Sequence, residues 1–319
     1  MGTIKENSRI NYYLKCGLGG ALSCGLTHSL ITPVDIAKCR IQMHPEKYKN
    51  LISALRLIGA NEGLKGLRLG LVPAFIGYSA QGALKHGLYE YFKDAYFRNH
   101  SLRRKEKREP ESKIEDLVWL GASASAEFLA DVALCPMEML KLKIQASNQS
   151  KLWSGPFITC IKNMYKLRRE TKFPFGSLTP LWSRQIPYTM TKFYFFEKIV
   201  NFTYKNVFRK PKESYSKHYQ LFVTFISGYL SGVICAFVSH PADMIVTQLS
   251  TSMKTGNCNI KRNISDVAKE IGIRKLFTAG LGTRMIMIGT LTGMQWWIYD
   301  AFKSTMGFET TGNKTDYLE

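Results

Sequence analysis

Six segments of the chain are rich in apolar residues, and each is interrupted by Gly, Ser, Thr and charged residues. The segments cover residues 12–40, 69–97, 114–145, 176–205, 217–250 and 280–305. Each is longer than the roughly 20 residues with which an α-helix crosses the hydrocarbon core of a bilayer. Polar groups inside such a helix must face the interior of a bundle or a water-filled cavity. The pattern therefore predicts an all-α membrane protein whose six transmembrane helices surround a polar centre.

The six segments form three pairs, because the chain contains one unit in three copies. The proline region of each copy reads THSLITPVDIAKCRIQ (27–42), ADVALCPMEMLKLKIQ (130–145) or CAFVSHPADMIVTQLS (235–250). Each has an acid two residues after its proline, and the prolines are 103 and 105 residues apart. A motif of an aromatic residue and an acid recurs at 89–90, 196–197 and 299–300. A fixed period of this kind indicates repeated structural units. The three units cover residues 12–97, 114–205 and 217–305, and residues 98–113 form a basic solvated linker between the first two.

Short amphipathic stretches separate the two spans of each unit, at 51–58, 157–168 and 260–270. Such stretches are typical of helices that lie on a membrane surface. The predicted fold is thus six transmembrane helices in three repeats related by pseudo-threefold symmetry, each with a short surface helix.

The charge of the chain limits its possible partners. There are 44 basic and 24 acidic residues, a formal net charge of +20, which suits nucleic acid, anionic lipid or an anionic substrate. A basic soluble nucleic-acid-binding protein is therefore an alternative. Its cations should cluster around groove-reading or aromatic motifs, whereas here they fall at span ends, on the surface stretches and in the linker. We expect no nucleic-acid partner.

Motifs for catalysis, cofactors or metals are missing from the sequence. The seven cysteines are scattered and form no CxxC pair, which indicates free thiols and no metal site. No GxSxG, P-loop or metal-ligand cluster occurs. We therefore expect neither an enzyme nor a bound cofactor.

The prolines predict a ring of charges at one end of the bundle. A proline inside a helix breaks its hydrogen-bond ladder and kinks it, so three kinked helices should converge. Asp35 is expected to pair with Lys141, and Asp243 with Lys38, while Glu138 finds no lysine in the third repeat. Buried ion pairs favour one conformation more than they add stability, which suits a gate that substrate binding can open. This proline-acid ring comprises Pro33, Asp35, Lys38, Pro136, Glu138, Lys141, Pro241 and Asp243.

A second ring follows from the aromatic-acid motif. Lys93 and Lys303 stand three residues after the acids of repeats one and three, and the middle repeat has Val200 in that place. This aromatic-acid ring comprises Glu90, Lys93, Glu197, Asp300 and Lys303.

The repeated Pro-x-acid motif with a period of about one hundred residues resembles the mitochondrial carrier family over nearly the whole chain. The phosphate carrier branch is resembled in particular by GYSAQGALKHGLYEYFK (77–93), ASAEFLADVALCPMEMLKLKIQ (124–145), PLWSRQIPYTMTKF (180–193), SHPADMIVTQ (239–248) and RMIMIGTLTGMQWWIYDAFK (284–303). The resemblance implies a monomeric carrier of the mitochondrial inner membrane that imports inorganic phosphate with a proton, or against hydroxide, by alternating access. It makes the proline-acid ring the matrix gate and the aromatic-acid ring the cytoplasmic gate. Copper or a small carboxylate is the alternative cargo.

Lipid contacts are also implied by the resemblance, with cardiolipin as the candidate. Here the chain departs from the family pattern at two places. Asn50 stands where glycine is common before the surface stretch, and residues 67–70 read LRLG where an aromatic residue, a basic residue and glycine are usual.

The resemblance places substrate contacts twelve and thirteen residues before each acid of the aromatic-acid motif. Further polar positions lie nine and five residues before the acids, and spacings of three, four and seven keep them on one helix face. An arginine fork fits a tetrahedral oxyanion, and lysines add positive potential inside a low-dielectric wall. The expected substrate-binding residues are Gln81, Lys85, Arg184, Gln185, Tyr188, Lys192 and Gln295.

Three titratable residues lie on the proline-containing helices at matching depths. His28 and Asp131 each precede their proline by five residues, and Glu127 precedes Asp131 by one helical turn. Two carboxylates held close together share a proton readily, and histidine titrates near neutral pH. A proton carried with a monoanionic phosphate would also cancel a cost of roughly 2.3 kcal/mol per 100 mV against a negative-inside potential. We expect His28, Glu127 and Asp131 to couple the proton.

Overall fold

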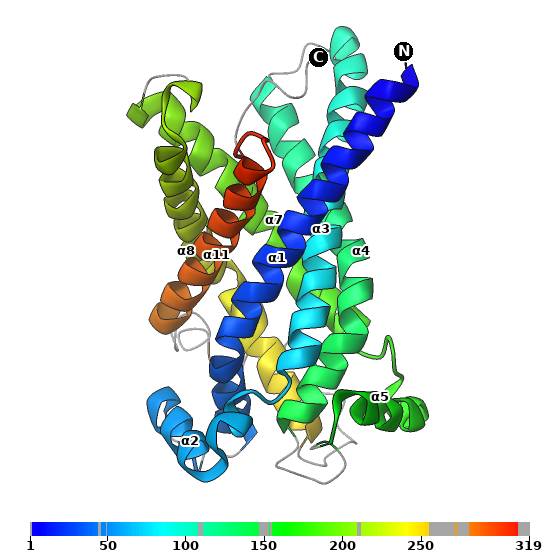
Figure 1. Ribbon diagram of the computed structural model, residues 1–319, viewed down its shortest axis with the longest axis vertical. Coiled ribbons are helices and arrows are strands. Elements are labelled where there is room, and N and C mark those ends of the chain that lie inside the picture. Colours follow the sequence, from blue (N-terminus) through cyan, green and yellow to red (C-terminus); the bar gives the residue numbers. More distant parts are fainter. Residues whose placement is uncertain are drawn as a thin grey trace.

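The computed structural model of the chain is a bundle of long α-helices, and the described chain begins and ends at the same end of the bundle, called here the end with the termini (Figure 1). It describes residues 2–43, 46–48, 50–107, 111–146, 153, 155–208, 212–254, 272 and 281–311. Side chains are described throughout these ranges except at 2–8, 42–43, 100–107, 111–113, 146, 213, 242–254 and 283.

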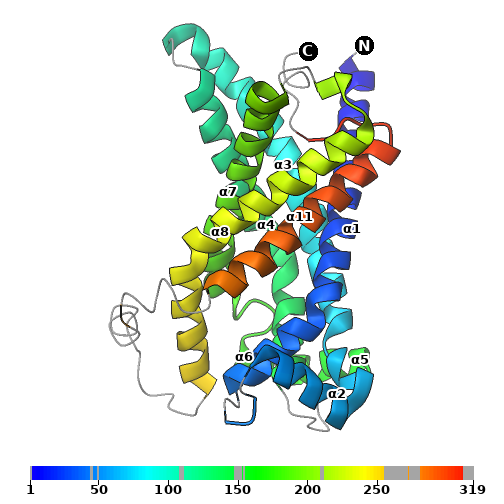
Figure 2. The same cartoon turned by 90° about the vertical axis from the view of Figure 1, so that its left-hand side faces the viewer.

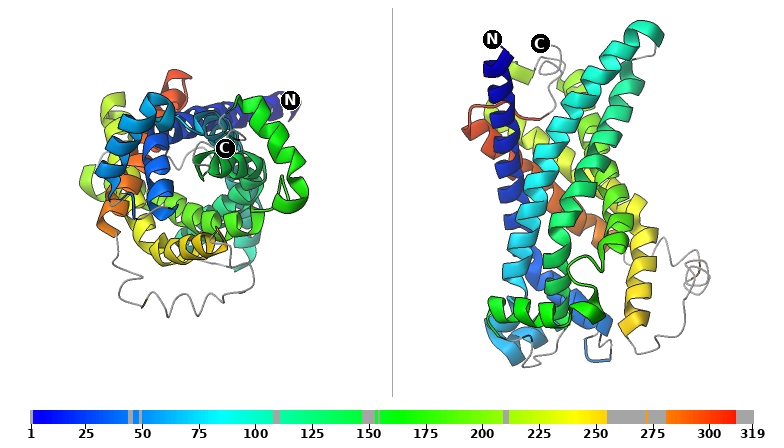
Figure 3. Two further views of the ribbon diagram at one scale, coloured as in Figure 1. Left: turned by 90° about the horizontal axis from the view of Figure 1, so that it is seen from below. Right: turned by 90° about the vertical axis from the view of Figure 1, so that its right-hand side faces the viewer.

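Six long helices correspond to the six predicted spans. They are α1 (Gly2–Met43), α3 (Leu71–Lys107), α4 (Glu111–Ala146), α7 (Leu178–Phe202), α8 (Lys217–Lys254) and α11 (Leu281–Thr305). Each packs against the next, and α11 packs against α1, so the helices close a ring in chain order. Seen along the bundle axis, they surround a common centre (Figure 3). The predicted linker is largely helical, because α3 continues to Lys107 and α4 begins at Glu111.

Short helices lie across the end of the bundle opposite the termini (Figure 1). They are α2 (Leu51–Leu67) and α5 (Phe157–Lys166), the latter followed by α6 (Arg168–Thr171). Asn50 caps α2: its side chain accepts a hydrogen bond from the Ser53 amide at 2.9 Å, while the Ser53 hydroxyl accepts one from the Asn50 amide at 3.2 Å. Gly63 breaks the helical geometry of α2 with φ of 62°. The predicted surface helix at 260–270 lies outside the described residues.

The repeated prolines lie inside continuous helices. Pro33 is in α1, Pro136 in α4 and Pro241 in α8. In α8 the last part runs in a different direction from the first part (Figure 2), as expected where a proline removes a backbone hydrogen bond.

The bundle is apolar outside and charged inside. On α1 a stripe of leucines is 43–68% exposed, at Leu14, Leu18, Leu22, Leu26 and Leu30. Buried ionisable residues instead point inward, among them Lys85, Glu127, Asp131 and Lys192, all at most 5% exposed. An apolar surface of this size with a charged interior suits a lipid environment. By length and hydropathy, two of the described helical stretches qualify as membrane spans, 114–145 and 217–241. The other long helices carry more inward-facing polar residues, which lower their mean hydropathy.

Glycines let the two helices of a repeat approach closely. A Cβ atom added to Gly20 of α1 would lie 2.2 Å from the carbonyl oxygen of Gly82 on α3, and one added to Gly82 would lie 2.2 Å from that of Gly20. In the third repeat a Cβ added to Gly232 of α8 would meet the backbone of Gly289 on α11 at 2.9 Å. The close crossing therefore recurs in two repeats.

Gly82→Ala is expected to destabilise the protein by about 1–3 kcal/mol because overpacking pushes the helices apart. The measurement is the thermal unfolding midpoint in detergent. Gly59→Ala on α2 is the matched control: no atom lies within 4 Å of its added Cβ, so this variant should be as stable as the parent or slightly more stable. Equal midpoints for Gly82→Ala and the parent would contradict the close crossing.

Candidate functional site

A cluster of charged and amide side chains joins α3 and α4 in the centre of the bundle. Lys85 Nζ lies 2.9 Å from Glu127 Oε2. Gln81 Nε2 donates to Glu127 Oε1 at 2.8 Å and to Asp131 Oδ1 at 3.0 Å. Glu127 and Asp131 are both 0% exposed, and Asp131 Oδ2 accepts no hydrogen bond from a described residue. Two buried carboxylates thus share one amide, Glu127 alone holds the buried cation, and Asp131 keeps one oxygen without a donor among the described residues.

The opposite wall of the centre is formed by α7 and α11. Lys192 donates to Gln295 Oε1, and both side chains are buried. Arg184, two turns earlier on α7, is half-buried, and its guanidinium makes no hydrogen bond or ion pair with a described residue. Its positive charge is close enough to the Tyr188 phenol to interact with it electrostatically. The guanidinium therefore has its planar donors available for an anion. Gln185 is half-buried beside it.

His28 is joined to the proline-acid ring through a tyrosine. The His28 ring stacks on the Tyr78 ring with centroids 3.6 Å apart and an interplanar angle of 4°. The Tyr78 hydroxyl donates to Glu138 Oε2 at 3.1 Å. Lys141 Nζ lies 4.9 Å from the centre of the Tyr78 ring and donates to Asp35 Oδ2 at 2.9 Å. Glu138, for which the sequence offers no lysine from the third repeat, thus receives a phenol hydrogen bond instead.

The other expected ion pair of the proline-acid ring joins Asp243 to Lys38, and the Asp243 side chain lies outside the described residues. Lys38, its expected partner, has Nζ 2.8 Å from Met287 Sδ on α11.

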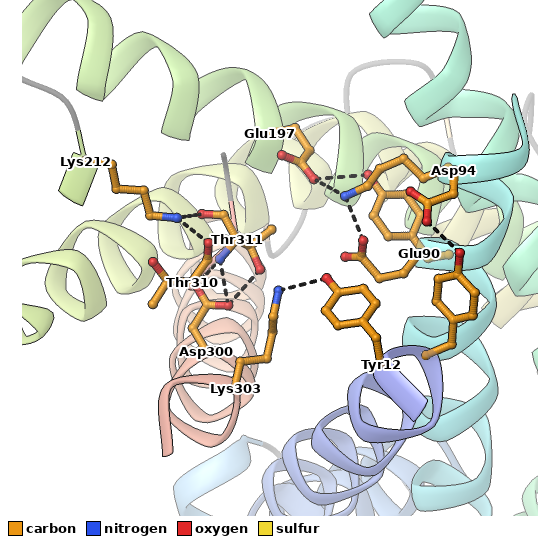
Figure 4. Close-up of polar contacts among 12 residues, drawn as sticks. Tyr12, Glu90, Asp94, Glu197, Lys212, Asp300, Lys303, Thr310 and Thr311 are labelled. Carbon is orange, nitrogen blue, oxygen red and sulfur yellow. Dashed lines mark hydrogen bonds and ion pairs between the residues drawn. The ribbon is translucent and has the colours of Figure 1, made fainter. Parts of the chain in front are cut away.

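The aromatic-acid ring is buried, and Figure 4 shows its three acids and Lys303 facing a common space beside Tyr12 of α1. Lys93 Nζ lies 3.0 Å from Glu90 Oε2 and 3.6 Å from Glu197 Oε1. Tyr89 also donates to Glu197 Oε1 at 3.2 Å. The structure therefore brings an acid of repeat two to the cation of repeat one.

Aromatic side chains separate this ring from the central cluster. Phe196 stacks on Trp296 with ring centroids 3.6 Å apart, and Phe193 lies edge-on to Trp296 at 5.1 Å. Val200, at the position of the missing cation, is 1% exposed and belongs to the same apolar cluster. The end with the termini is thus closed in this structure by an apolar layer and a charged layer.

Comparison with known proteins identifies the family of this helical ring. The sequence profile described as "Mitochondrial carrier protein" matches residues 11–100, 117–207 and 217–310. The chain belongs to the mitochondrial carrier family. It is a multi-pass protein of the mitochondrial inner membrane with the three-repeat helical fold of that family.

Relatives within the mitochondrial carrier family are similar over most of their length. Mitochondrial phosphate carrier protein 3 of Arabidopsis thaliana is 44% identical, over 94% of this chain and 76% of the relative. The probable mitochondrial phosphate carrier protein of Schizosaccharomyces pombe is 44% identical, over 94% of this chain and 93% of the relative. Solute carrier family 25 member 3 of Homo sapiens is 42% identical, over 92% of this chain and 76% of the relative.

One central residue of this carrier escaped the sequence-based prediction. Arg284 on α11 donates from Nη2 to Ser239 Oγ at 3.1 Å, and its charge acts on Tyr188 and on Arg184. A spacing of eleven residues, about three helical turns, places Arg284 on the same face of α11 as Gln295. That spacing was the available signal, and it was missed because the prediction counted only fixed offsets from the repeated acids.

Proposed function

We propose that this mitochondrial carrier imports inorganic phosphate together with a proton, by alternating access. The observation that carries the proposal is the central cluster, in which Glu127 of a buried carboxylate pair holds a buried lysine close to further cations. The similarity to proteins named phosphate carriers supports the choice of cargo. The chain is then a transporter and not an enzyme, and one chain is the transporting unit.

Phosphate would bind between α3 and α7. The Arg184 guanidinium presents a planar pair of donors to two phosphate oxygens, the geometry that favours bidentate anion binding. Lys192 and Lys85 add positive charge, and Arg284 is a further cation on α11. The neutral groups Gln81, Gln185, Tyr188 and Gln295 supply hydrogen bonds to the remaining oxygens.

Proton coupling would follow from competition for Lys85. While Glu127 is ionised, it holds Lys85 at 2.9 Å, so the lysine is neutralised and unavailable to the anion. A proton taken up by the Glu127–Asp131 pair weakens this hold and frees Lys85 for phosphate. In this proposal His28, which stacks on Tyr78, passes the proton between the carboxylate pair and the proline-acid ring. One proton then accompanies one anion, which is thermodynamically equal to exchange for hydroxide.

The two rings would act as gates. In this proposal the proline-acid ring opens and closes the matrix side, and the aromatic-acid ring the cytoplasmic side. Bound lipid, cardiolipin included, would sit against the surface helices.

Breaking the Asp35–Lys141 pair is expected to slow transport, because the matrix gate then closes less readily. Asp35→Asn and Lys141→Met should each lower phosphate uptake about tenfold, a change that corresponds to about 1.4 kcal/mol. Uptake is measured in proteoliposomes. The exchange variant Asp35→Lys with Lys141→Asp should regain part of the lost uptake. An exchange variant no better than the single variants would contradict a role for this pair.

The experiment that tests the proposed function is uptake of labelled phosphate into liposomes that hold the purified carrier. We expect uptake that saturates, and that rises when the outside is more acidic than the lumen. Copper and small carboxylates are offered in parallel as the alternative cargoes. Folded carrier that takes up one of these and no phosphate would overturn the proposed cargo and leave the carrier fold unaffected.

A further inference from the structure

The aromatic-acid ring has a vacant place in its charge pattern. Lys93 of repeat one meets Glu197 of repeat two. By pseudo-threefold symmetry, the cation for Asp300 of repeat three should come from position 200 of repeat two. That position is Val200, buried among aromatic side chains. Asp300 is nevertheless 0% exposed, and a buried carboxylate without partners is costly.

The end of the described chain supplies the partners of Asp300 (Figure 4). The Thr311 amide lies 3.1 Å from both carboxylate oxygens of Asp300, and the Thr311 hydroxyl donates to Oδ1 at 2.7 Å. The hydroxyl of Thr224 on α8 donates to Oδ2 at 2.8 Å. Two hydroxyls and a backbone amide thus replace the missing ammonium group.

Lys212 holds this segment in place from the short helix η2 (Lys212–Ser214) between repeats two and three. Its Nζ donates to the carbonyl of Thr310 and, at 3.1 Å, to that of Thr311. Burial lowers the pKa of Lys212, and the negative charge of Asp300 opposes that shift. A cation is therefore still present near Asp300, but it comes from the segment between repeats two and three instead of from α7.

The same segment also touches the first repeat. The ring of Phe308 lies edge-on to that of Tyr12 on α1, with centroids 5.2 Å apart, and Lys15 Nζ lies 5.0 Å from the Phe308 centroid. Tyr12 in turn accepts a hydrogen bond from Lys303 at 3.4 Å. Residues 308–311 therefore link α1, α8, α11 and η2 at the closed end.

We propose that residues 308–311, named here the C-terminal clasp, together with Lys212 form the third contact of the cytoplasmic gate and must release before that side opens. The inference rests on the proposed alternating access but not on the identity of the cargo. When α11 moves away at this end, either Asp300 gives up the donors of Thr311, or the clasp moves with α11 and gives up its contacts with Lys212 and Tyr12. Loss of the clasp then shifts the conformational equilibrium toward the state that is open on the side of the termini.

Access to Cys24 from the side of the termini reports on this equilibrium. Cys24 is buried in the centre of the bundle, close to Lys85 and Lys192. A membrane-impermeant maleimide is added to vesicles of known orientation, and labelling of the Cys24 peptide is followed by mass spectrometry, with Cys24→Ser as the blank. Ending the chain after Glu309 should raise the labelling rate about tenfold, the change expected for about 1.4 kcal/mol. Lys212→Met and Thr311→Val should raise it by smaller factors.

A rescue variant and a control make the test specific. Val200→Lys in the shortened chain restores the missing cation and should return the rate toward that of the parent. Thr305→Val alters an exposed hydroxyl whose one hydrogen bond to a described residue is to the Phe302 carbonyl of α11, and should leave the rate unchanged. An unchanged rate in the folded shortened chain, or in Lys212→Met and Thr311→Val if that chain does not accumulate, would overturn the clasp. Clasp-dependent labelling in a carrier that transports no phosphate would support the clasp and refute only the cargo.

Discussion

Arg184→Ala is expected to reduce phosphate uptake by about 100-fold or more, since two charge-assisted hydrogen bonds contribute roughly 1.5–3 kcal/mol each. The reason is structural. Lys85 is held by Glu127 and Lys192 by Gln295, whereas the Arg184 guanidinium bonds to no described residue. It is thus the cation whose donors are ready for the anion before any contact breaks. Initial rates of uptake at several phosphate concentrations measure the effect.

Two variants show whether the fork or merely the charge matters. Arg184→Lys keeps the charge but loses the planar pair of donors, and should recover only part of the uptake. Arg169→Ala removes a positive charge from an exposed position on α6, and should transport like the parent. Uptake by Arg184→Ala within a few-fold of the parent would refute the proposed role of this residue.

Glu127→Gln is expected to abolish the stimulation of uptake by an acidic outside. Glutamine imitates the protonated carboxyl, so Lys85 is released at every pH and the proton no longer matters. In the parent carrier, pH controls whether Lys85 is available to phosphate. Acid protonates the carboxylate pair and frees Lys85, while alkali keeps the pair ionised and Lys85 neutralised. Phosphate–phosphate exchange needs no net proton movement and should survive in the variant. Both activities are measured with labelled phosphate across a set of pH steps.

Glu62→Gln is the matched control for this experiment. Glu62 also forms a buried ion pair, with Arg40, but at the junction of α1 and α2, away from the centre. Its replacement should leave the pH response intact even if stability falls. Full acid stimulation in Glu127→Gln would contradict the competition for Lys85, and so would loss of exchange in a folded Glu127→Gln variant.

The repeats made much of this molecule predictable. Helix periodicity relates residues of one helix to each other through a constant rotation per residue, so counting from Glu90 or Glu197 was enough to choose the inward faces of α3 and α7. The pairing of Asp35 with Lys141 needed only symmetry between neighbouring repeats, and the structure brings these residues together. The third surface helix and the Asp243 pair remain predictions, because they lie outside the described residues.

The three repeats, the six spans and the inward face of each helix can be derived from the sequence, since they depend on residue spacing along one helix and recur in three copies. Which side chains meet across helices depends on the tertiary structure. In this structure Lys85 pairs with Glu127, and Tyr78 contacts both His28 and Glu138. Thr311 forms hydrogen bonds with Asp300. The clasp has no helical period, and the described parts of the other repeats contain no counterpart to it. Its position therefore depends on how α1, α8 and α11 pack. Packing between segments that are distant in the chain cannot be derived from the residue spacing within one segment.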